Sequence, residues 1–383
     1  MEEGVLPDSC KTAAVVPIHK GGDKSIPANY RPVSLTSVIV KILERIIRKA
    51  IVTHLESNNL MNDTQHGFRK GRSCISALIN VYDDIMHSLM ASDNHCVDMI
   101  YLDFAKAFDK VDHNILLHKL KSLGITGNIG IWISSFLGNR KQFVQIPGGI
   151  SEIGSVTSGV PQGTVLGPVL FLILIGDITK NLSHSKVSSF ADDTRLYSSI
   201  KNEDDCDNLQ KDLDIVYKWA IENNMQFNSQ KFEYLCFHTK PALYTNNVYL
   251  TPKINIINPS FDVRDLGIIM TNTCTFNQHI SKVVKTCTQL VGMTLRAISA
   301  RDKLSMLTVY KSTILPRLEY GCQLWNPNAI HLINSLERVQ RSFTKYIDNM
   351  YDISYEKRLS ALNLYSLQRR RDRYLICHTN TND

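Results

Sequence analysis

Several signals that assign a chain to a simple class are missing from this sequence. Its nine cysteines include no CxxC pair, which disfavours a disulfide framework or a closed zinc site and predicts no disulfide-linked partner. Its longest apolar run, residues 165–175, is too short to cross a bilayer. Its first residues are polar, which predicts that there is no signal peptide. We therefore expect an intracellular protein that does not enter a membrane.

Neither sign of charge dominates the composition. Lysines and arginines number 43 and aspartates and glutamates 36, so the formal net charge is +7. This mild excess permits a polyanionic partner without requiring one. The basic residues gather in three clusters, and a solvated helix face explains each cluster as well as a nucleic-acid contact does. The clusters are Lys41, Arg45, Arg48 and Lys49; Arg69, Lys70 and Arg72; and Arg369, Arg370, Arg371 and Arg373.

With 383 residues, 43% of them hydrophobic, the chain can build one large or two ordinary domains. Apolar residues at helical spacing predict helices, and short apolar or alternating runs predict strands. We expect helices at 38–55, 76–90, 113–123, 164–178 and 204–223 and through most of the chain from 277, and strands at 97–104, 142–146, 187–190 and 195–198. This mixture of strands with segregated helices predicts an α+β fold.

Two acidic sites stand at the ends of apolar strands. Asp103 ends the run 97–104, and Asp192 and Asp193 lie at the turn of the expected hairpin. Phosphoryl transfer needs hard oxygen ligands for Mg²⁺, and two metal ions roughly 3.5–4 Å apart can activate the attacking hydroxyl and stabilise the leaving oxygen. Taken alone, each site is better explained by ordinary turn or cap aspartates. Taken together, and with the motifs below, they favour a metal site.

A glycine-containing loop, residues 158–163, lies between the two acidic sites. Its glycines allow the backbone to approach a ligand closely, and the helix expected after Gly163 presents free N–H groups to anions. Gln162 can form hydrogen bonds with a base, a sugar or the backbone. A plain turn from loop to helix explains the same string without any ligand.

Further side chains suit a nucleotide. The ring of Phe108 can block a 2′-hydroxyl beside a metal-bound nucleotide, although core packing explains it equally well. Arginine and lysine suit phosphate oxygens, although surface charge is the simpler explanation. The cations in question are Lys20, Arg31, Arg69, Arg72 and Lys231.

The residues above belong to a series of short strings along the chain. The strings are PIHK at 17–20, NYRPVSL at 29–35, QHGFRKGRS at 65–73, YLDFAKAFD at 101–109, SGVPQGTVLGP at 158–168, FADDT at 190–194, NSQK at 228–231, LG at 266–267, PRLEYG at 316–321 and LWNP at 324–327. In this order they resemble the reverse transcriptase of non-LTR, LINE-type retrotransposons of the jockey-like kind, and the resemblance extends over nearly the whole chain.

The resemblance implies a right-hand polymerase and a set of residue roles. It implies fingers and palm in 1–270, with a palm core of antiparallel sheet and helices at about 97–270, and a helical thumb and C-terminal region in 271–383. It implies two Mg²⁺ ions, with Mn²⁺ as an alternative. The implied metal ligands are Asp103, Asp192 and Asp193; the implied pyrophosphate proton donor is Lys231; the implied nucleotide contacts are Lys20, Arg31, Phe108, Gln162 and Gly163; and the implied nucleic-acid contacts are Arg69, Arg72, Leu266 and Gly267.

The implied activity is RNA-directed DNA polymerisation with an RNA template, a DNA primer or target and deoxynucleoside triphosphates, in a ribonucleoprotein found in nucleus and cytoplasm. Two alternatives remain: an inactive relic that binds nucleic acid, and an RNA-dependent RNA polymerase. Intact motif residues favour activity, and Phe108 argues against ribose, although the adjacent Asp109 weakens that argument. Residues 1–16 are too few for the family's endonuclease, so we expect a fragment that extends primers but does not nick DNA.

Overall fold

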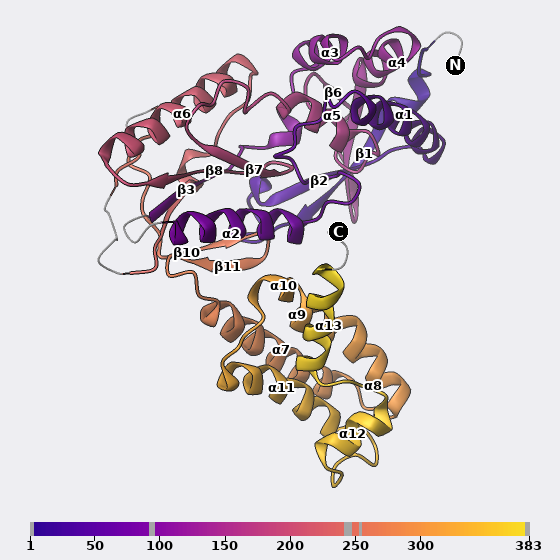
Figure 1. The fold of residues 1–383 in the computed structure, drawn as a ribbon. Helices are drawn as coiled ribbons and strands as arrows, with labels where there is room; N and C mark the ends of the chain where they lie inside the picture. Colours follow the sequence, from indigo (N-terminus) through magenta and orange to yellow (C-terminus); the bar gives the residue numbers. More distant parts are fainter. Residues whose placement is uncertain (1–3, 92–95, 241–246, 253–254, 380–383) are drawn as a thin grey trace. The chain divides into compact units, whose positions relative to one another are not determined.

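The computed structural model describes residues 4–91, 96–240, 247–252 and 255–379, with side chains described up to residue 375. The chain divides into two compact units (Figure 1). The first contains Met1–Ala77, Val97–Tyr234 and Asn246–Pro259, and the second contains Leu78–Cys96, Leu235–Thr245 and Ser260–Asp383. Among the described residues, no helix is both long and apolar enough to cross a membrane.

One sheet of the first unit is built around the N-terminal hairpin. Its strands run in the order β2-β1-β4-β5, and β6 also pairs with β4. β1 and β2 are antiparallel, with Ile18 opposite Arg31, so Lys20 just after β1 lies at the same end of the hairpin as Arg31. The bounds are β1 Thr12–His19, β2 Tyr30–Leu35, β4 Arg140–Ile146, β5 Gly149–Ile150 and β6 Gly154–Val156.

The second sheet carries the acidic motifs. Its strand order is β7-β8-β3-β9. All residues of β3 are buried except the half-buried Tyr101, which explains its nearly continuous apolar sequence. The expected hairpin is confirmed, because β7 and β8 pair in antiparallel fashion with Phe190 opposite Asp193. The bounds are β3 Cys96–Leu102, β7 Lys186–Phe190, β8 Asp193–Ile200 and β9 Glu233–Phe237.

The helices of the first unit follow the sequence pattern with two differences. The helix expected after Gly163 begins only at Gly167, and the helix α4 was not predicted. The N-cap role of Asp112 is confirmed, because its carboxylate accepts from Asn114 N–H at 2.9 Å and Ile115 N–H at 3.1 Å. The bounds are α1 Val38–Ser57, α3 His113–Ser122, α4 Gly127–Leu137, α5 Gly167–Ile175 and α6 Glu203–Glu222; α2, Cys74–Met90, runs from the first unit into the second.

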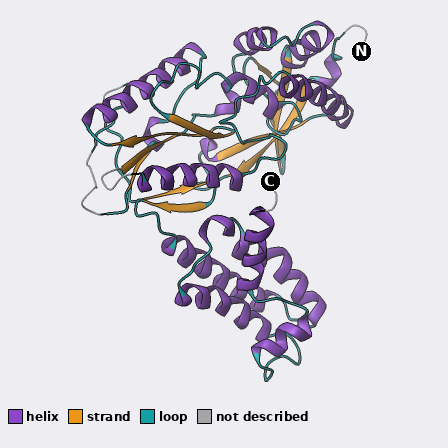
Figure 2. Ribbon diagram, in the orientation of Figure 1, coloured by secondary structure: helices purple, strands orange, loops and turns teal. Residues whose placement is uncertain are grey.

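The second unit is mostly helical, as its pattern predicts (Figure 2). A short antiparallel hairpin, β10 and β11, precedes the helices. A π-helix at Tyr310–Ile314 joins α8 to α9. The bounds are β10 Asp262–Asp265, β11 Ile268–Thr271, α7 Asn277–Ala297, α8 Lys303–Val309, α9 Leu315–Glu319, α10 Cys322–Trp325, α11 Ile330–Lys345, α12 Tyr355–Leu362 and α13 Leu367–Thr379. Sheets with segregated helices confirm the α+β class.

A buried polar network holds α11 in this helical unit. Gln340 is fully buried; its amide oxygen accepts from Tyr310 Oη at 2.6 Å. Its amide nitrogen donates to Tyr355 Oη at 2.8 Å and to the Tyr365 carbonyl at 3.0 Å. Every polar atom of the Gln340 side chain is therefore bonded, as buried polar groups require.

Candidate functional site

Two carboxylates from adjacent strands meet at one edge of the second sheet. Asp103 follows β3 directly, and Asp192 lies in the turn between β7 and β8. Because β8 is the neighbour of β3, the two strand ends present their acids at the same edge. Burial raises the pKa of Asp192, and the negative charge of Asp103 raises this pKa further. The structure therefore brings together the two acidic motifs that the sequence singled out.

Cations surround this pair of carboxylates. Lys231 Nζ donates to Asp103 Oδ2 at 3.1 Å. It reaches Asp103 because Asn228 N–H bonds the Asp103 carbonyl at 2.8 Å, which brings the 3₁₀ helix Ser229–Lys231 beside the end of β3. The positive charges of Arg31 and Lys20 lower the pKa of Asp192, against the effect of burial. Three of the predicted cations thus lie around the carboxylates.

Asp193 is placed differently from its neighbour. It is the first residue of β8 and is exposed, so the turn itself consists of Ala191 and Asp192. Ala191 adopts a left-handed backbone conformation with φ of 56°, which is unfavourable for any residue with a Cβ. The sequence predicted both aspartates at the turn, and the structure moves one of them into the strand.

Hydrogen bonds attach the loop between the acidic motifs, residues 158–163, to the rest of the first unit. Gln162 Nε2 donates to Asp109 Oδ1 at 2.9 Å, and the Gln162 carbonyl accepts from Ser34 N–H of β2 at 2.8 Å. Gly159 has φ of 88°, and a Cβ there would lie 2.8 Å from the Asp109 carbonyl oxygen. Only glycine fits such an approach. The loop therefore has a defined position between β2 and the segment 107–109.

Phe108 is half-buried and stacks on Phe171 of α5, with ring centroids 4.5 Å apart and an interplanar angle of 24°. This contact supports the core-packing explanation for one face of the ring. Gly163, with φ of 94°, lies against β2, where a Cβ would approach the Ser34 carbonyl oxygen to 3.1 Å.

Glu44 on α1 is a residue of this region that sequence reasoning missed. Its side chain is fully buried, and its Oε2 accepts from Val165 N–H at 2.7 Å and Leu166 N–H at 2.9 Å. The expected free N–H groups at the start of the apolar helix are therefore already occupied, which corrects the prediction of an anion site there. Burial raises the pKa of Glu44, while the two backbone bonds lower it. A single glutamate in an amphipathic helix gives no sequence signal for such a role.

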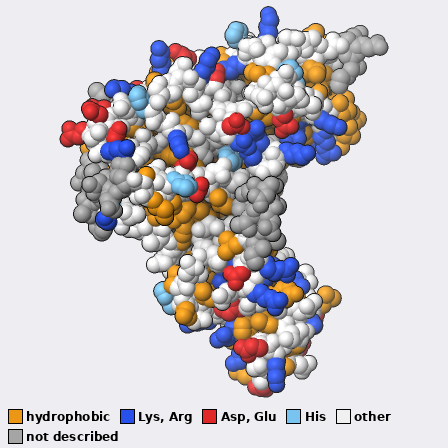
Figure 3. Space-filling model, in the orientation of Figure 1, with side chains coloured by type: hydrophobic (Ala, Val, Ile, Leu, Met, Phe, Trp, Pro, Cys, Tyr) orange, Lys and Arg blue, Asp and Glu red, His pale blue; other side chains and the backbone are white. Residues whose placement is uncertain are grey.

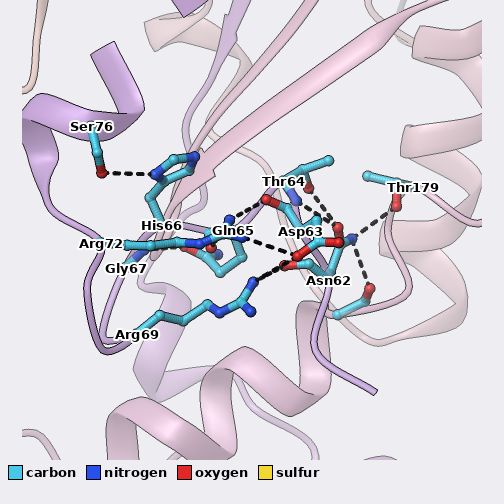
Figure 4. A network of polar contacts seen from close by, with 11 residues as sticks. Asn62, Asp63, Thr64, Gln65, His66, Gly67, Arg69, Arg72, Ser76 and Thr179 are labelled. Carbon is cyan, nitrogen blue, oxygen red and sulfur yellow. Dashed lines mark hydrogen bonds and ion pairs between the residues drawn. The ribbon is translucent and has the colours of Figure 1, made fainter. Parts of the chain in front are cut away.

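Arg69 and Arg72 bond to their own loop (Figure 4). Arg69 Nη1 donates to the Asn62 carbonyl at 2.8 Å, and Arg72 Nη2 donates to Asp63 Oδ1 at 3.0 Å. Arg72 Nη1 also donates to the Gln65 carbonyl at 3.2 Å. These guanidinium groups brace residues 62–72, and their predicted contact with nucleic acid stays a prediction.

The other two basic clusters differ from each other. On α1, Arg45 and Lys49 are exposed, and Figure 3 shows Lys and Arg side chains gathered beside this helix. On α13, Arg371 is fully buried and its Nε donates to Asn326 Oδ1 at 2.9 Å, while Arg370 forms a two-pronged ion pair with Glu319. Arg371 therefore fits neither a solvated helix face nor a nucleic-acid contact, and Arg370 is engaged by Glu319 within the helical unit.

Leu266 and Gly267 form the tight turn between β10 and β11 in the second unit. Both have positive φ, 43° and 93°. Tyr320 Oη donates to the Leu266 carbonyl at 2.8 Å, and its ring lies 3.3 Å from where a Cβ of Gly267 would be. The turn is thus fixed by a tyrosine from the PRLEYG string.

The donor set at the carboxylate edge suits hard divalent cations. Asp103 and Asp192 offer oxygen ligands of the kind that Mg²⁺ prefers. Burial and the like charge of Asp103 both raise the pKa of Asp192, and a divalent cation between the two groups would relieve that repulsion. The residues present therefore fit a metal site.

Comparisons with known proteins agree with this geometry. Residues 18–295 match the sequence profile of the reverse transcriptase (RNA-dependent DNA polymerase) family. The chain is 31% identical over 358 residues to a probable RNA-directed DNA polymerase from transposon X-element of Drosophila melanogaster, covering 89% of this chain and 38% of that protein. It is 29% identical over 360 residues to the RNA-directed DNA polymerase from mobile element jockey of Drosophila funebris, covering 90% and 38%. The chain thus spans about two fifths of these curated relatives.

Solved structures show the same fold at low identity. Telomerase from Candida albicans, in complex with a TWJ fragment of telomeric RNA, matches with a TM-score of 0.53 at 10% identity, over 94% of this chain and 66% of that one. Apo telomerase from Candida tropicalis matches with a TM-score of 0.52 at 11% identity, over 94% and 63%. These likenesses confirm the right-hand polymerase fold. Because the family profile matches well over half of the sequence, the chain belongs to the reverse transcriptase family.

Proposed function

We propose that this chain is an RNA-directed DNA polymerase that adds deoxynucleotides to a primer 3′ end on an RNA template. The observation that carries the proposal is the meeting of Asp103 and Asp192 with Lys20, Arg31 and Lys231 at one sheet edge. Phosphoryl transfer depends on positioning and on electrostatic stabilisation, and this edge supplies both acids for metals and cations for phosphates.

Polymerases of this family use divalent metal ions, and we propose two Mg²⁺ ions here, with Mn²⁺ as an alternative. Asp103 and Asp192 hold them, and Asp193 at the start of β8 supports the site. The chemistry that the bound ions would supply is activation of the attacking hydroxyl and neutralisation of the leaving oxygen.

The cations have separate roles in this proposal. Lys20 and Arg31 are exposed at one end of the β1–β2 hairpin, where they bind triphosphate oxygens by charge-assisted hydrogen bonds. Lys231, held 3.1 Å from Asp103, gives its proton to departing pyrophosphate as a general acid.

The pocket walls select the nucleotide. Gln162 and Gly163 are fixed against β2. Phe108 packs one face on Phe171, which holds the ring rigidly enough to exclude a 2′-hydroxyl. We assign 1–270 to fingers and palm and 271–383 to a thumb, with the Leu266–Gly267 turn contacting the primer.

The test is primer extension on poly(rA)/oligo(dT) with Mg²⁺ and either dTTP or UTP. We expect extension with dTTP, little with UTP, and none when EDTA removes the metal. Tight binding of primer-template without any extension would instead identify an inactive nucleic-acid-binding relic. Equal use of UTP would identify an RNA polymerase and remove Phe108 from the gate role.

A further inference from the structure

A short extended segment, residues 64–66, docks against the hairpin that carries Asp192. His66 N–H donates to the Ser189 carbonyl at 2.8 Å, and Ser189 N–H donates to the Thr64 carbonyl at 2.9 Å. These bonds form a parallel bridge between Gln65 and Ser189. The backbone pairing therefore reaches β7 just before the strand ends.

Beyond that point, the side chain of Gln65 continues the pairing. Gln65 Oε1 accepts from Ala191 N–H at 2.9 Å, and Gln65 Nε2 donates to the Ala191 carbonyl at 3.3 Å. The same Oε1 accepts from Gly67 N–H at 2.7 Å. Gln65 is buried, so these groups have little access to water. One amide thus bonds both backbone groups of Ala191.

Ala191 is the residue of the hairpin that most needs support. Its φ of 56° is left-handed, a conformation that persists in residues other than glycine only where surrounding contacts over-determine it. Asp192 is the next residue, so the backbone of Ala191 sets the direction in which that carboxylate leaves the turn. Any relaxation at Ala191 moves Asp192 relative to Asp103.

Close packing at Gly67 supports the same arrangement. A Cβ at Gly67 would lie 2.5 Å from Ala191 N and 3.1 Å from its Cα. No side chain fits there unless the turn moves. The hairpin is therefore held in place by Gln65 and by contact with the backbone of Gly67.

The docking segment is itself braced, as Figure 4 shows. Asn62 Nδ2 donates to the Gly176 carbonyl at 3.0 Å and to Thr179 Oγ1 at 2.9 Å, which ties the segment to the region after α5. Arg72 closes the other side through Asp63. Because these contacts anchor it, Gln65 presents its amide from a fixed position.

We propose that Gln65 is a positioning residue for the metal site: its amide fixes the left-handed Ala191 turn and so sets the geometry of Asp192. This inference rests on the proposed polymerase function. It assigns the QHG part of the 65–73 string to organising the catalytic turn, a different role from the nucleic-acid contact predicted for Arg69 and Arg72.

The test is the variant Gln65→Met, which keeps the length of the side chain and removes its hydrogen bonds. The expected result is a loss of Mn²⁺ affinity of roughly 10-fold to 100-fold, as for other groups that orient metal ligands. Mn²⁺ binding is followed by the electron paramagnetic resonance of the free ion, in the absence of nucleotide. Single-nucleotide incorporation should slow by a similar factor, with affinity for primer-template unchanged.

Two further measurements separate positioning from folding. Hydrogen exchange of residues 187–194 should accelerate in Gln65→Met, because Ala191 N–H loses its acceptor. Gly67→Ala should reproduce both effects, since its Cβ displaces the same turn. The matched control is Gln340→Met, which removes a buried amide from the helical unit and should leave Mn²⁺ affinity unchanged.

The outcomes distinguish this inference from the function on which it rests. A wild-type chain that extends primers, together with a folded Gln65→Met protein that binds Mn²⁺ and incorporates nucleotides normally, would overturn the positioning role alone. A wild-type chain that binds Mn²⁺ but extends no primer would overturn the proposed function. Equal loss of Mn²⁺ affinity in Gln340→Met would show that the effect is general destabilisation.

Discussion

The carboxylate edge of the first unit and the Gln340 network of the second unit are both polar clusters, but they are built in opposite ways. In the network, Gln340 is fully buried and both ends of its amide are bonded to neighbouring groups. At the carboxylate edge, the Lys231 side chain is 66% exposed and the Asp103 side chain is 31% exposed. Burial and the negative charge of Asp103 both raise the pKa of Asp192 there.

This difference separates structural polarity from functional polarity. A buried group whose bonds are all made within the protein stabilises the fold and has nothing left for a ligand. Acids held close to each other, with cations exposed beside them, are unfavourable for the free protein and become favourable when a metal and a phosphate bind. A variant at the carboxylate edge should therefore lower catalysis, and a variant in the Gln340 network should lower stability.

The largest effect is expected at the carboxylate edge. Asp192→Asn removes one metal-ligand charge but no element of the fold. Loss of several kcal/mol of transition-state stabilisation corresponds to a fall in nucleotide incorporation of about 10³-fold or more. Primer extension measures the rate, and fluorescence anisotropy should show primer-template binding largely unchanged. Wild-type extension by this variant would show that the two-metal assignment is wrong.

A substitution in the Gln340 network should lower the free energy of unfolding. Gln340→Met leaves Tyr310 Oη and the Tyr365 carbonyl without their buried partner, at a cost of about 2–4 kcal/mol in free energy of unfolding. Urea denaturation measures the change. Below the unfolding transition, the incorporation rate should match the wild type; a parallel loss of rate would mean that the two clusters are not functionally separate.

Replacing one cation in each unit should separate catalysis from stability in the same way, with smaller effects. Lys20→Ala should raise the KM for deoxynucleotide about tenfold, the value of one charge-assisted hydrogen bond, without lowering Tm, because Lys20 is exposed. Arg370→Ala should lower Tm and leave KM unchanged, because it breaks the ion pair with Glu319. A raised KM in Arg370→Ala together with a lowered Tm in Lys20→Ala would contradict this separation.

The smallest effect concerns pH. Burial lowers the pKa of His279 from 6.5 to about 4, and its Nδ1 accepts from Ile269 N–H at 3.2 Å. Since the folded pKa lies below the unfolded value, His279 stabilises the fold above pH 6.5 and loses this contribution as the pH falls towards 4. Between pH 6.5 and about pH 5.5, His279 should lower the free energy of unfolding by about 1 kcal/mol.

The measurement is urea denaturation at both pH values for the wild type and for His279→Asn, which keeps an acceptor that does not titrate. The variant should lose about 1 kcal/mol less than the wild type over this interval. Identical losses in both proteins would assign the pH dependence to other groups.

The sequence predicted local structure well where the signal was local. The helix over 38–55 and the N-cap at Asp112 are confirmed, because apolar spacing and capping depend on neighbouring residues. Helix α5 begins later than predicted, with Pro168 in its first turn, and the N–H groups of Val165 and Leu166 bond to Glu44 of a distant helix, a partner that no local pattern shows. Helix α4 was missed, because Gly127 and Gly130 weaken the helical pattern of its sequence.

By itself, the sequence determined the α+β class, the order of the motifs and the identity of the two acidic strands, since these follow from residue type and period along the chain. Only the tertiary structure decided which charges are available. It placed Asp103 and Asp192 at one edge, buried Arg371 inside the helical unit and bonded Gln65 to the backbone of the turn that carries Asp192. The physical reason is that pairing, burial and backbone contact join residues far apart in sequence, and no local pattern records which partner each polar group finds.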